Sequence, residues 1–392
     1  MSQKYFAQIT PGLEEVLKQE LKTLGCRKLK LEEGGVYFEG TRKHLYRVLQ
    51  WSRLANRIYW TLIDATAPNS NALFERVIRG PWAKIFSFNS KLESLPIALR
   101  VNLGQHPEFQ GTGQIESLVF RAIEKTLVDH IQVKSAKWNS TDPHCQRLLI
   151  RVHQHRITIR LDASGHLLHK RGWRSVEGQA PLRPTLAAAM LDLVAWNTKE
   201  PLIDPMCGSG TIPIEAARKA AFLQPRLPQT YTCQLWENYD LQLWEQETNF
   251  YQRSKENQFT ENSPSQTLYQ SHIYAFDISP DAIKTTQSHL QKAEIMVQVT
   301  VNDVASLRPP LNSEPGLIIF NPPYGLRVKE GHELKKLLTI FSQDRSSWLG
   351  WRLGFIYPRQ LSPPSVAGLQ AKEVARFQHG GLPVWVWTYT HS

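Results

Sequence analysis

The residues best suited to chemistry are Asn321-Pro322-Pro323-Tyr324-Gly325, directly after the apolar run GLIIF. Two prolines fix the backbone just past the end of a strand, which aims the Asn321 side-chain oxygen and the Pro322 carbonyl into the adjoining cleft. Two acceptors placed in this way can hold both hydrogens of a planar amino group. Tyr324 adds an aromatic face for stacking a base, worth about 1–3 kcal/mol. The segment predicts Asn321, Pro322 and Tyr324 as catalytic residues, and a simple turn is the alternative.

A glycine-rich turn, DPMCGSGT at residues 204–211, lies between an apolar strand and a helix. Such a turn at the carboxyl end of a first strand lets the backbone approach a nucleotide-like ligand closely. It is not GxGxxG, and it lacks the Lys-Ser/Thr of a phosphate loop, so a ligand without phosphates is favoured. A generic glycine turn is the alternative. No covalent role is expected for Cys207.

Two further acidic positions end strand-like segments. Asp277 closes HIYAFDI, where a carboxylate commonly accepts hydrogen bonds from ribose hydroxyls. Asn302-Asp303 follows VQVTV, where a carboxylate can accept from an adenine amino group, and a loop-capping role is equally open. The predicted cofactor-binding residues are Asp204, Pro205, Cys207, Gly208, Gly210, Thr211, Asp277, Ile278, Asn302, Asp303 and Asn321.

The segments around these motifs alternate between helix and strand. A helix at 186–196 precedes the strand at 201–204, and a second helix follows the glycine turn. Further strands are predicted at 272–278, 297–303, 316–323, 352–358 and 383–389. Helices separate most of them, which is typical of βαβ units and a parallel sheet. Residues 222–271 are polar and predict an insertion that carries some helix.

The first half of the chain has a different order of predicted helices and strands. A strand at 4–10, a helix that ends near Gly25 and a hairpin with Gly34-Gly35 as its turn precede a helix predicted from Thr41 to about Trp60. This β-α-β-β-α order is compatible with a ferredoxin-like unit. Strands at 97–103 and 147–164 and a helix at 117–131 follow. The Gly/Pro-rich, basic stretch 165–185 predicts the passage between the two halves.

Charge divides the chain in the same place. Residues 1–175 hold 27 Lys and Arg against 15 Asp and Glu, a net charge of +12, whereas residues 176–392 hold 19 against 20, a net of −1. A polyanion is the natural partner of the basic half, and a solvated basic surface is the alternative. Lys170, Arg171 and Arg174 lie in the passage, where contact with phosphate and simple solvation are both open.

Other classes of protein are disfavoured. The chain has no apolar run of 18 residues and no signal-like N-terminus, so neither a membrane span nor secretion is expected. The four cysteines form no CxxC pair and the histidines no HExxH spacing, which disfavours disulfides and metal sites and fits the cytoplasm. A length of 392 residues suits two or three domains, and the oligomeric state stays open.

Together the four motifs resemble those of class I methyltransferases. The chain more narrowly resembles the bacterial THUMP-domain RNA guanine-N2 methyltransferases, the family that includes the N-terminal part of the bifunctional 23S rRNA enzyme. The segments that carry this resemblance are YFAQITPGLEEVLKQEL, LHKRGWR (168–174), APLRPTLAAAMLDL (180–193), DPMCGSGTIPIEAA (204–217), FDISPDAI (276–283) and NPPYGLR (321–327).

The resemblance implies a fold, a cofactor and a substrate. The fold is a Rossmann-like α/β methyltransferase domain at 186–392, preceded by an α+β region with a ferredoxin-like part at 1–45, a THUMP RNA-binding module at 46–162 and a linker at 163–185. The cofactor is S-adenosyl-L-methionine, without a metal. The substrate is RNA, contacted by Lys170, Arg171, Arg174 and Arg327, with guanine N2 of rRNA as target. The rivals are a tRNA substrate, an enzyme that methylates adenine N6 of RNA or DNA or a glutamine amide of a protein, and a non-enzymatic RNA-binding protein.

Overall fold

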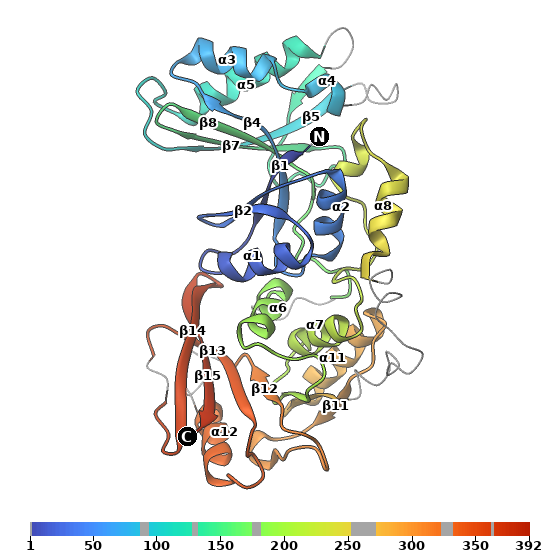
Figure 1. Ribbon diagram of the computed structural model, residues 1–392, viewed down its shortest axis with the longest axis vertical. Helices are drawn as coiled ribbons and strands as arrows, with labels where there is room; N and C mark the ends of the chain where they lie inside the picture. Colours follow the sequence, from blue (N-terminus) through green and yellow to red (C-terminus); the bar gives the residue numbers. More distant parts are fainter. Residues whose placement is uncertain are drawn as a thin grey trace.

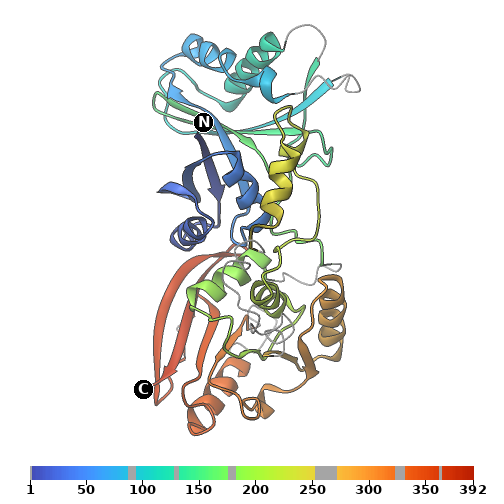
Figure 2. The same ribbon diagram turned by 45° about the vertical axis from the view of Figure 1, so that its right-hand side comes forward.

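The computed structural model describes residues 2–86, 94–127, 132–174, 182–251, 272–322, 332–361 and 364–392. Figures 1 and 2 show an elongated molecule in which the helices between residues 70 and 126 lie at one end and the described residues of 272–392 lie toward the other, with the first elements of the chain between them. Over these residues the strands form two sheets, one for each half of the chain. No helix of the described part has the length and apolar character needed to cross a membrane.

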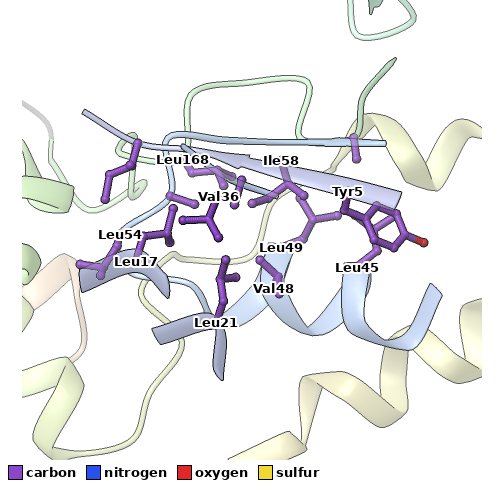
Figure 3. Packing of buried hydrophobic residues seen from close by; sticks show 14 of the residues in the cluster. Tyr5, Leu17, Leu21, Val36, Leu45, Val48, Leu49, Leu54, Ile58 and Leu168 are labelled. Atoms are coloured by element: carbon purple, nitrogen blue, oxygen red, sulfur yellow. The ribbon is translucent and has the colours of Figure 1, made fainter. Parts of the chain in front are cut away.

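The chain begins with a β-α-β-β-α-β unit. Its elements are β1 (Gln3–Gln8), α1 (Glu14–Thr23), β2 (Arg27–Glu32), β3 (Gly35–Gly40), α2 (Arg42–Trp51) and β4 (Arg57–Thr66). The strands lie in the order β2-β3-β1-β4, and β1 pairs antiparallel with both neighbours. Leu17 and Leu21 of α1 pack with Val48 and Leu49 of α2 against Val36 of the sheet (Figure 3). Burial of each leucine contributes about 1.5–3 kcal/mol.

Two predictions for this unit are wrong. The second helix ends at Trp51 instead of near Trp60, and the strand β4 begins at Arg57. The boundary predicted between residues 45 and 46 therefore falls inside α2. A ferredoxin-like unit needs both its second helix and its fourth strand to bury its core, so the unit extends to Thr66.

The same sheet continues into the next segment. Its elements are α3 (Ser70–Ile78), α4 (Trp82–Ile85), β5 (Ser94–Leu103), α5 (Thr112–Thr126), β6 (Gln132–Ser135), β7 (Gln146–His153) and β8 (Arg156–Asp162). β8 pairs antiparallel with β4, so the order runs β2-β3-β1-β4-β8-β7-β5-β6 across the described strands. Helices α3, α4 and α5 lie together on one face of this part of the sheet (Figure 1).

The second half is the predicted parallel α/β domain. Its elements are α6 (Pro184–Leu193), β9 (Leu202–Asp204), α7 (Thr211–Ala220), η1 (Thr232–Leu235), α8 (Leu241–Thr248), β10 (Ile273–Asp277), α11 (Pro280–Lys292), β11 (Gln298–Val301), η2 (Val304–Ser306), β12 (Leu317–Phe320), α12 (His332–Gln343), β13 (Arg352–Pro358), β14 (Leu369–His379) and β15 (Leu382–His391). The strand order is β11-β10-β9-β12-β13-β15-β14, parallel up to β13. β15 runs antiparallel to both of its neighbours.

The predicted insertion packs back onto the first half. Helix α8 lies alongside α2 in both views (Figures 1 and 2). Arg47 Nε of α2 lies 2.6 Å from Glu247 Oε2 of α8, and the indole of Trp51 donates to the Glu247 carbonyl at 2.7 Å. Farther along, the indole of Trp236 donates to Gln146 of β7 at 3.1 Å. The insertion therefore ties the two halves together, while residues 252–271 lie outside the described ranges.

The described part of the predicted linker, residues 163–174 and 182–185, is also packed against the rest of the chain. Leu168 and Trp173 are fully buried, and the Leu168 amide donates to the Asn56 carbonyl at 2.9 Å. The backbone of β14 also packs closely against Gly12 of the first half, whose φ is +95°. A Cβ at Gly12 would lie 2.0 Å from the Arg376 carbonyl oxygen. The two halves thus meet through buried contacts on several segments.

Candidate active site

The predicted motifs meet at one edge of the second sheet. Because β10, β9 and β12 are parallel neighbours, their carboxyl ends lie together. Ala275 pairs with Asp204, so Asp277 stands two positions beyond the end of β9 on one side. On the other side Ile318 pairs with Ile203, so Ile319 is level with Asp204, the last residue of β9, and Asn321 stands two positions beyond it. The first strand and its glycine turn therefore lie between the Asp277 and Asn321 positions.

The glycine turn has the backbone that its sequence predicts. Gly208 has a φ of +55° and Gly210 a φ of +77°, a left-handed region that favours glycine. A Cβ at Gly210 would lie 2.7 Å from Thr286 Cγ2, so Gly210 lets α11 pack closely. A Cβ at Gly208 would enter open space, which leaves room for a ligand beside the turn.

Side chains of neighbouring elements hold this turn, and sequence reasoning missed Thr286 among them. The Asp277 carboxylate accepts from the amides of Gly208 and Ser279, both at 2.9 Å. The buried hydroxyl of Thr286 donates to the Gly208 carbonyl at 2.8 Å. Thr286 stands three positions after Ile283 on the buried face of α11, and this spacing was the only signal for it in the sequence.

Asp204 and Cys207 are buried under the turn. Burial raises the pKa of Asp204 well above its usual value, and its Oδ1 accepts from the Met206 amide at 3.2 Å. Burial also raises the pKa of the Cys207 thiol, and the nearby Asp204 adds to this effect. A thiol must ionise to act as a nucleophile, so the environment of Cys207 agrees with a role in the turn rather than in covalent chemistry.

The remaining cofactor candidates surround the same edge. Ile278 is 66% exposed, so its apolar side chain is accessible to a ligand. The Asn302 amide donates to the Asp277 carbonyl at 3.0 Å and so joins the loops after β10 and β11. Asp303 caps η2 by accepting from the Ala305 amide at 2.9 Å, as the loop-capping alternative predicts. Pro205 and Thr211 are buried at the two ends of the turn.

Asn321 carries an unusual polar group. Its Oδ1 atom is buried and has no hydrogen-bond partner among the described residues. A buried acceptor left unpaired costs about 1–3 kcal/mol, so this position suits an N–H donor from a ligand, since the described residues supply none. Pro322 is buried beside it. Tyr324 and Arg327, predicted for base stacking and RNA contact, lie outside the described ranges.

The basic residues predicted to contact RNA differ in their surroundings. Lys170 is exposed. Arg174 donates to the Thr211 hydroxyl and to the Leu182 carbonyl, so it links the passage to the first residue of α7. Arg171 is buried and makes two hydrogen bonds to Glu215, at 2.9 and 3.3 Å. Its predicted RNA contact is therefore corrected, because a guanidinium enclosed between the halves has no access to phosphate.

No group of three or more His, Cys, Asp or Glu side chains within the described ranges is arranged to hold a metal ion.

Two family models match the chain. One, described as "RMKL-like, methyltransferase domain", covers residues 171–384, and the other, described as "RlmL ferredoxin-like domain", covers residues 4–59. The ribosomal RNA large subunit methyltransferase K/L of Psychromonas ingrahamii is 30% identical over 96% of this chain and 49% of its own length. The chain thus spans about half the length of that curated relative.

Solved structures resemble the chain over nearly its whole length. A predicted N6-adenine-specific DNA methylase from Listeria monocytogenes has a TM-score of 0.78 and 22% identity, covering 98% of this chain and 96% of its own. SMU.472 complexed with SAH has a TM-score of 0.77 and 20% identity, covering 100% and 98%. TrmN from Thermus thermophilus has a TM-score of 0.69 and 18% identity, covering 100% of both chains.

At these identities the structures support the fold alone, a ferredoxin-like unit followed by a Rossmann-like domain. The family follows from the methyltransferase model, which covers more than half of the chain and includes the glycine turn and the Asn321 strand end. This chain therefore belongs to the RMKL-like family of S-adenosylmethionine-dependent methyltransferases.

Proposed function

We propose that this protein transfers a methyl group from S-adenosylmethionine to the exocyclic amino nitrogen of a base in RNA, and that the target is N2 of a guanine in large-subunit rRNA. The observation that carries the amino-group assignment is the buried Oδ1 of Asn321, which lacks a hydrogen-bond partner among the described residues. An amino group on a base supplies the N–H donor that this oxygen lacks. Its position beside the cofactor turn suits a transfer between two ligands.

The residues of the turn fit S-adenosylmethionine. The open space at Gly208 admits the methionine part of the cofactor, the Asp277 carboxylate can accept from ribose hydroxyls, and exposed Ile278 offers an apolar surface for adenine. The cofactor carries positive charge. Because a nearby cation favours the ionised form of a carboxyl group, a bound cofactor would favour ionisation of the buried Asp204. When bound, the cofactor supplies an activated methyl group on a sulfonium, so the protein needs mainly to position the acceptor.

Asn321 and the Pro322 carbonyl act on the acceptor. The lone pair of an aromatic amino group is delocalised into its ring, which makes the nitrogen a poor nucleophile. Two acceptors that hold both amino hydrogens favour a more pyramidal nitrogen, and they stabilise the positive charge that develops on it. They also orient the nitrogen toward the methyl group, and positioning of this kind can supply several kcal/mol of the barrier. A base within a helix must be unpaired or flipped to reach this site.

The assignment of RNA as the substrate is supported by the charge of the first half and by similarity to a known relative. The first 175 residues carry a net charge of +12, which suits a polyanion that the second half then modifies. The relative from Psychromonas ingrahamii is named as an enzyme of large-subunit rRNA, and this name supports rRNA over tRNA. The acceptors at Asn321 recognise any amino group, so the choice of guanine N2 over adenine N6 rests on the family resemblance.

Analysis of the methylated product tests the base assignment. The protein should transfer labelled methyl to large-subunit rRNA from cells that lack this gene, and nucleoside digestion should yield N2-methylguanosine. The control is the same reaction with rRNA from cells that keep the gene. This rRNA is already methylated at the target and should incorporate little label. A label found in N6-methyladenosine would refute the guanine assignment and leave the Asn321 mechanism standing. A label found only in tRNA would refute the rRNA assignment.

Substitution of Asp277 tests the cofactor site. Asp277→Ala removes the predicted ribose acceptor and frees the Gly208 amide. Because a hydrogen bond to a charged group contributes about 1.5–3 kcal/mol, we expect S-adenosylmethionine affinity to fall about 10- to 100-fold in calorimetry. Asp281→Ala, a change of the exposed second residue of α11, is the matched control and should bind normally. Unchanged affinity in Asp277→Ala would remove this carboxylate from the site.

A further inference from the structure

A cavity of about 900 Å³ lies where the two halves meet, and its lining includes none of the residues at the carboxyl ends of β9, β10 and β12. Its walls include the end of β1 and its loop (8–11), the start of β4 (56–59) and the loop after β6 (138–143) from the first half. They also include the passage (165–170), the segment 230–235 and the turn between β14 and β15 (378–381). The long strands β14 and β15 reach up toward this junction in Figure 1. Both halves of the chain therefore contribute walls.

The cavity is strongly basic. Its lining includes the cations Arg57, Arg100, Arg147, Lys170 and Arg183, against the single carboxylate of Asp142. The charge of Arg57 is matched by buried Asp162. Arg100, Lys170 and Arg183 are exposed, and no ion pair involves them in the described ranges. Three cations that face the same space without a carboxylate partner attract an anion.

An aromatic ring stands in the same wall. Trp138 is half-buried, and the Arg100 guanidinium lies 4.4 Å from the centre of its ring. Buried Arg147 fixes the loop that carries Trp138 by donating to the carbonyls of Trp138 at 3.0 Å and of Ser140 at 2.6 Å. A planar group that stacks on Trp138 meets a preorganised wall, so little entropy is lost on binding.

The passage adds hydrogen-bonding groups without partners. His166 Nε2 and His169 Nδ1 are buried atoms with no hydrogen-bond partner among the described residues, and both histidines line the cavity. Burial, assisted by Arg226 and Arg57, lowers the pKa of His166 to about 4. Burial, assisted by Arg183, lowers the pKa of His169 to about 4. Neutral imidazoles offer one donor and one acceptor each, which suits the polar edge of a base.

The cations of this cavity match the phosphate of a nucleotide, and the aromatic face and neutral hydrogen-bonding groups match the face and the polar edge of its base. We propose that this cavity binds an unstacked nucleotide of a single-stranded segment of the RNA substrate, at a site separate from the one where the base is methylated. The proposal rests on the proposed function for the identity of the ligand as RNA. It also extends the RNA contact beyond the basic first half, because Arg183 and the β14–β15 turn belong to the second half.

Binding of a short fluorescein-labelled single-stranded RNA of mixed sequence to the full chain, followed by anisotropy, tests this site. Stacking on one aromatic residue contributes about 1–3 kcal/mol, so Trp138→Ala should weaken binding about tenfold, whereas Trp138→Phe should retain most of the affinity. Arg100→Gln should weaken binding and lower the salt dependence by about one unit of slope. The same RNA annealed to its complement should bind without dependence on Trp138.

Arg76→Gln is the matched control. Arg76 is exposed on α3, is not among the cavity-lining residues, and carries the same charge as Arg100. If Arg76→Gln weakens binding as much as Arg100→Gln does, the effect is one of net charge and the site is refuted. Wild-type affinity in Trp138→Ala, or equal loss for duplex RNA, also refutes it. Arg100→Gln and Trp138→Phe carry the test if Trp138→Ala does not fold, as judged by thermal melting.

Methyl transfer separates this proposal from the proposed function. If the wild-type chain methylates RNA and Trp138→Ala leaves the KM for that RNA unchanged, the result refutes the nucleotide site and supports the methyltransferase function. If the wild-type chain binds single-stranded RNA in a Trp138-dependent way but transfers no methyl to any RNA, the site stands and the substrate assignment falls.

Discussion

Asn321→Ala should lower kcat about 100- to 1,000-fold and leave the affinity for S-adenosylmethionine nearly unchanged. Removal of one preorganised group that stabilises a developing charge typically has an effect of this size. The Asn321 oxygen is already buried and unpaired among the described residues, so truncation removes an acceptor and no hydrogen bond that the folded chain is shown to make. Calorimetry for the cofactor and single-turnover methylation of RNA measure the two quantities separately.

Two more variants sharpen this test. Asn321→Asp keeps an oxygen that accepts from an amino group, so it should retain more activity than Asn321→Ala. Asn249→Ala changes an exposed asparagine after α8 and should transfer methyl at the wild-type rate. Near-normal turnover in Asn321→Ala, or equal losses in the alanine and aspartate variants, would contradict the acceptor role of this side chain.

Glu215→Ala should destabilise the protein by about 3–5 kcal/mol, because it leaves a buried guanidinium without its carboxylate. Glu215 and Arg171 are both fully enclosed, with Arg171 Nε 2.9 Å from Glu215 Oε1. Arg171 also donates to the carbonyls of Leu168 at 3.0 Å and Arg53 at 2.6 Å, so it joins the passage, α7 and the first half. Burial lowers the pKa of Arg171 to about 10, and the residue stays charged at neutral pH.

Urea unfolding followed by circular dichroism measures this loss. The double variant Arg171→Met, Glu215→Met removes both charges and should recover much of the stability, since an apolar pair of similar volume often replaces a buried ion pair without loss. Glu15→Ala breaks the exposed pair with Lys18 and should change stability by less than about 0.5 kcal/mol. A loss below about 1 kcal/mol in Glu215→Ala would show that the junction does not depend on this pair.

The strand-end residues and the glycine turn of the candidate site could be predicted from the sequence. Asp204, Asp277 and Asn321 each end an apolar strand segment, and parallel strands place such ends at one edge of a sheet. The glycine turn could be recognised because Gly208 and Gly210 adopt backbone angles that other residues rarely adopt. These features are local, so a short stretch of sequence carries them.

Other elements could not be predicted from local pattern. Strand β14 was missed because it is an edge strand whose charged residues and β-bulge between Glu373 and Ala375 interrupt the alternation of apolar positions in LQAKEVARFQH. The helix predicted through Trp60 ends at Trp51, since the segment after it pairs with β1 and β8. Pairing of this kind depends on strands far away in the sequence, and it overrides the local preference.

The sequence by itself determined the order of the elements, the glycine turn and the residues that stand at the strand ends. Only the tertiary structure decided that Arg171 is a buried ion-pair partner and not a phosphate contact, that 222–251 packs on the first half, and that Trp138, His169 and Arg183 share one cavity. The physical reason is that burial and pairing of a charged or aromatic side chain depend on what packs over it, and here the covering segments lie up to about 200 positions away in the chain, as Arg47 and Glu247 do.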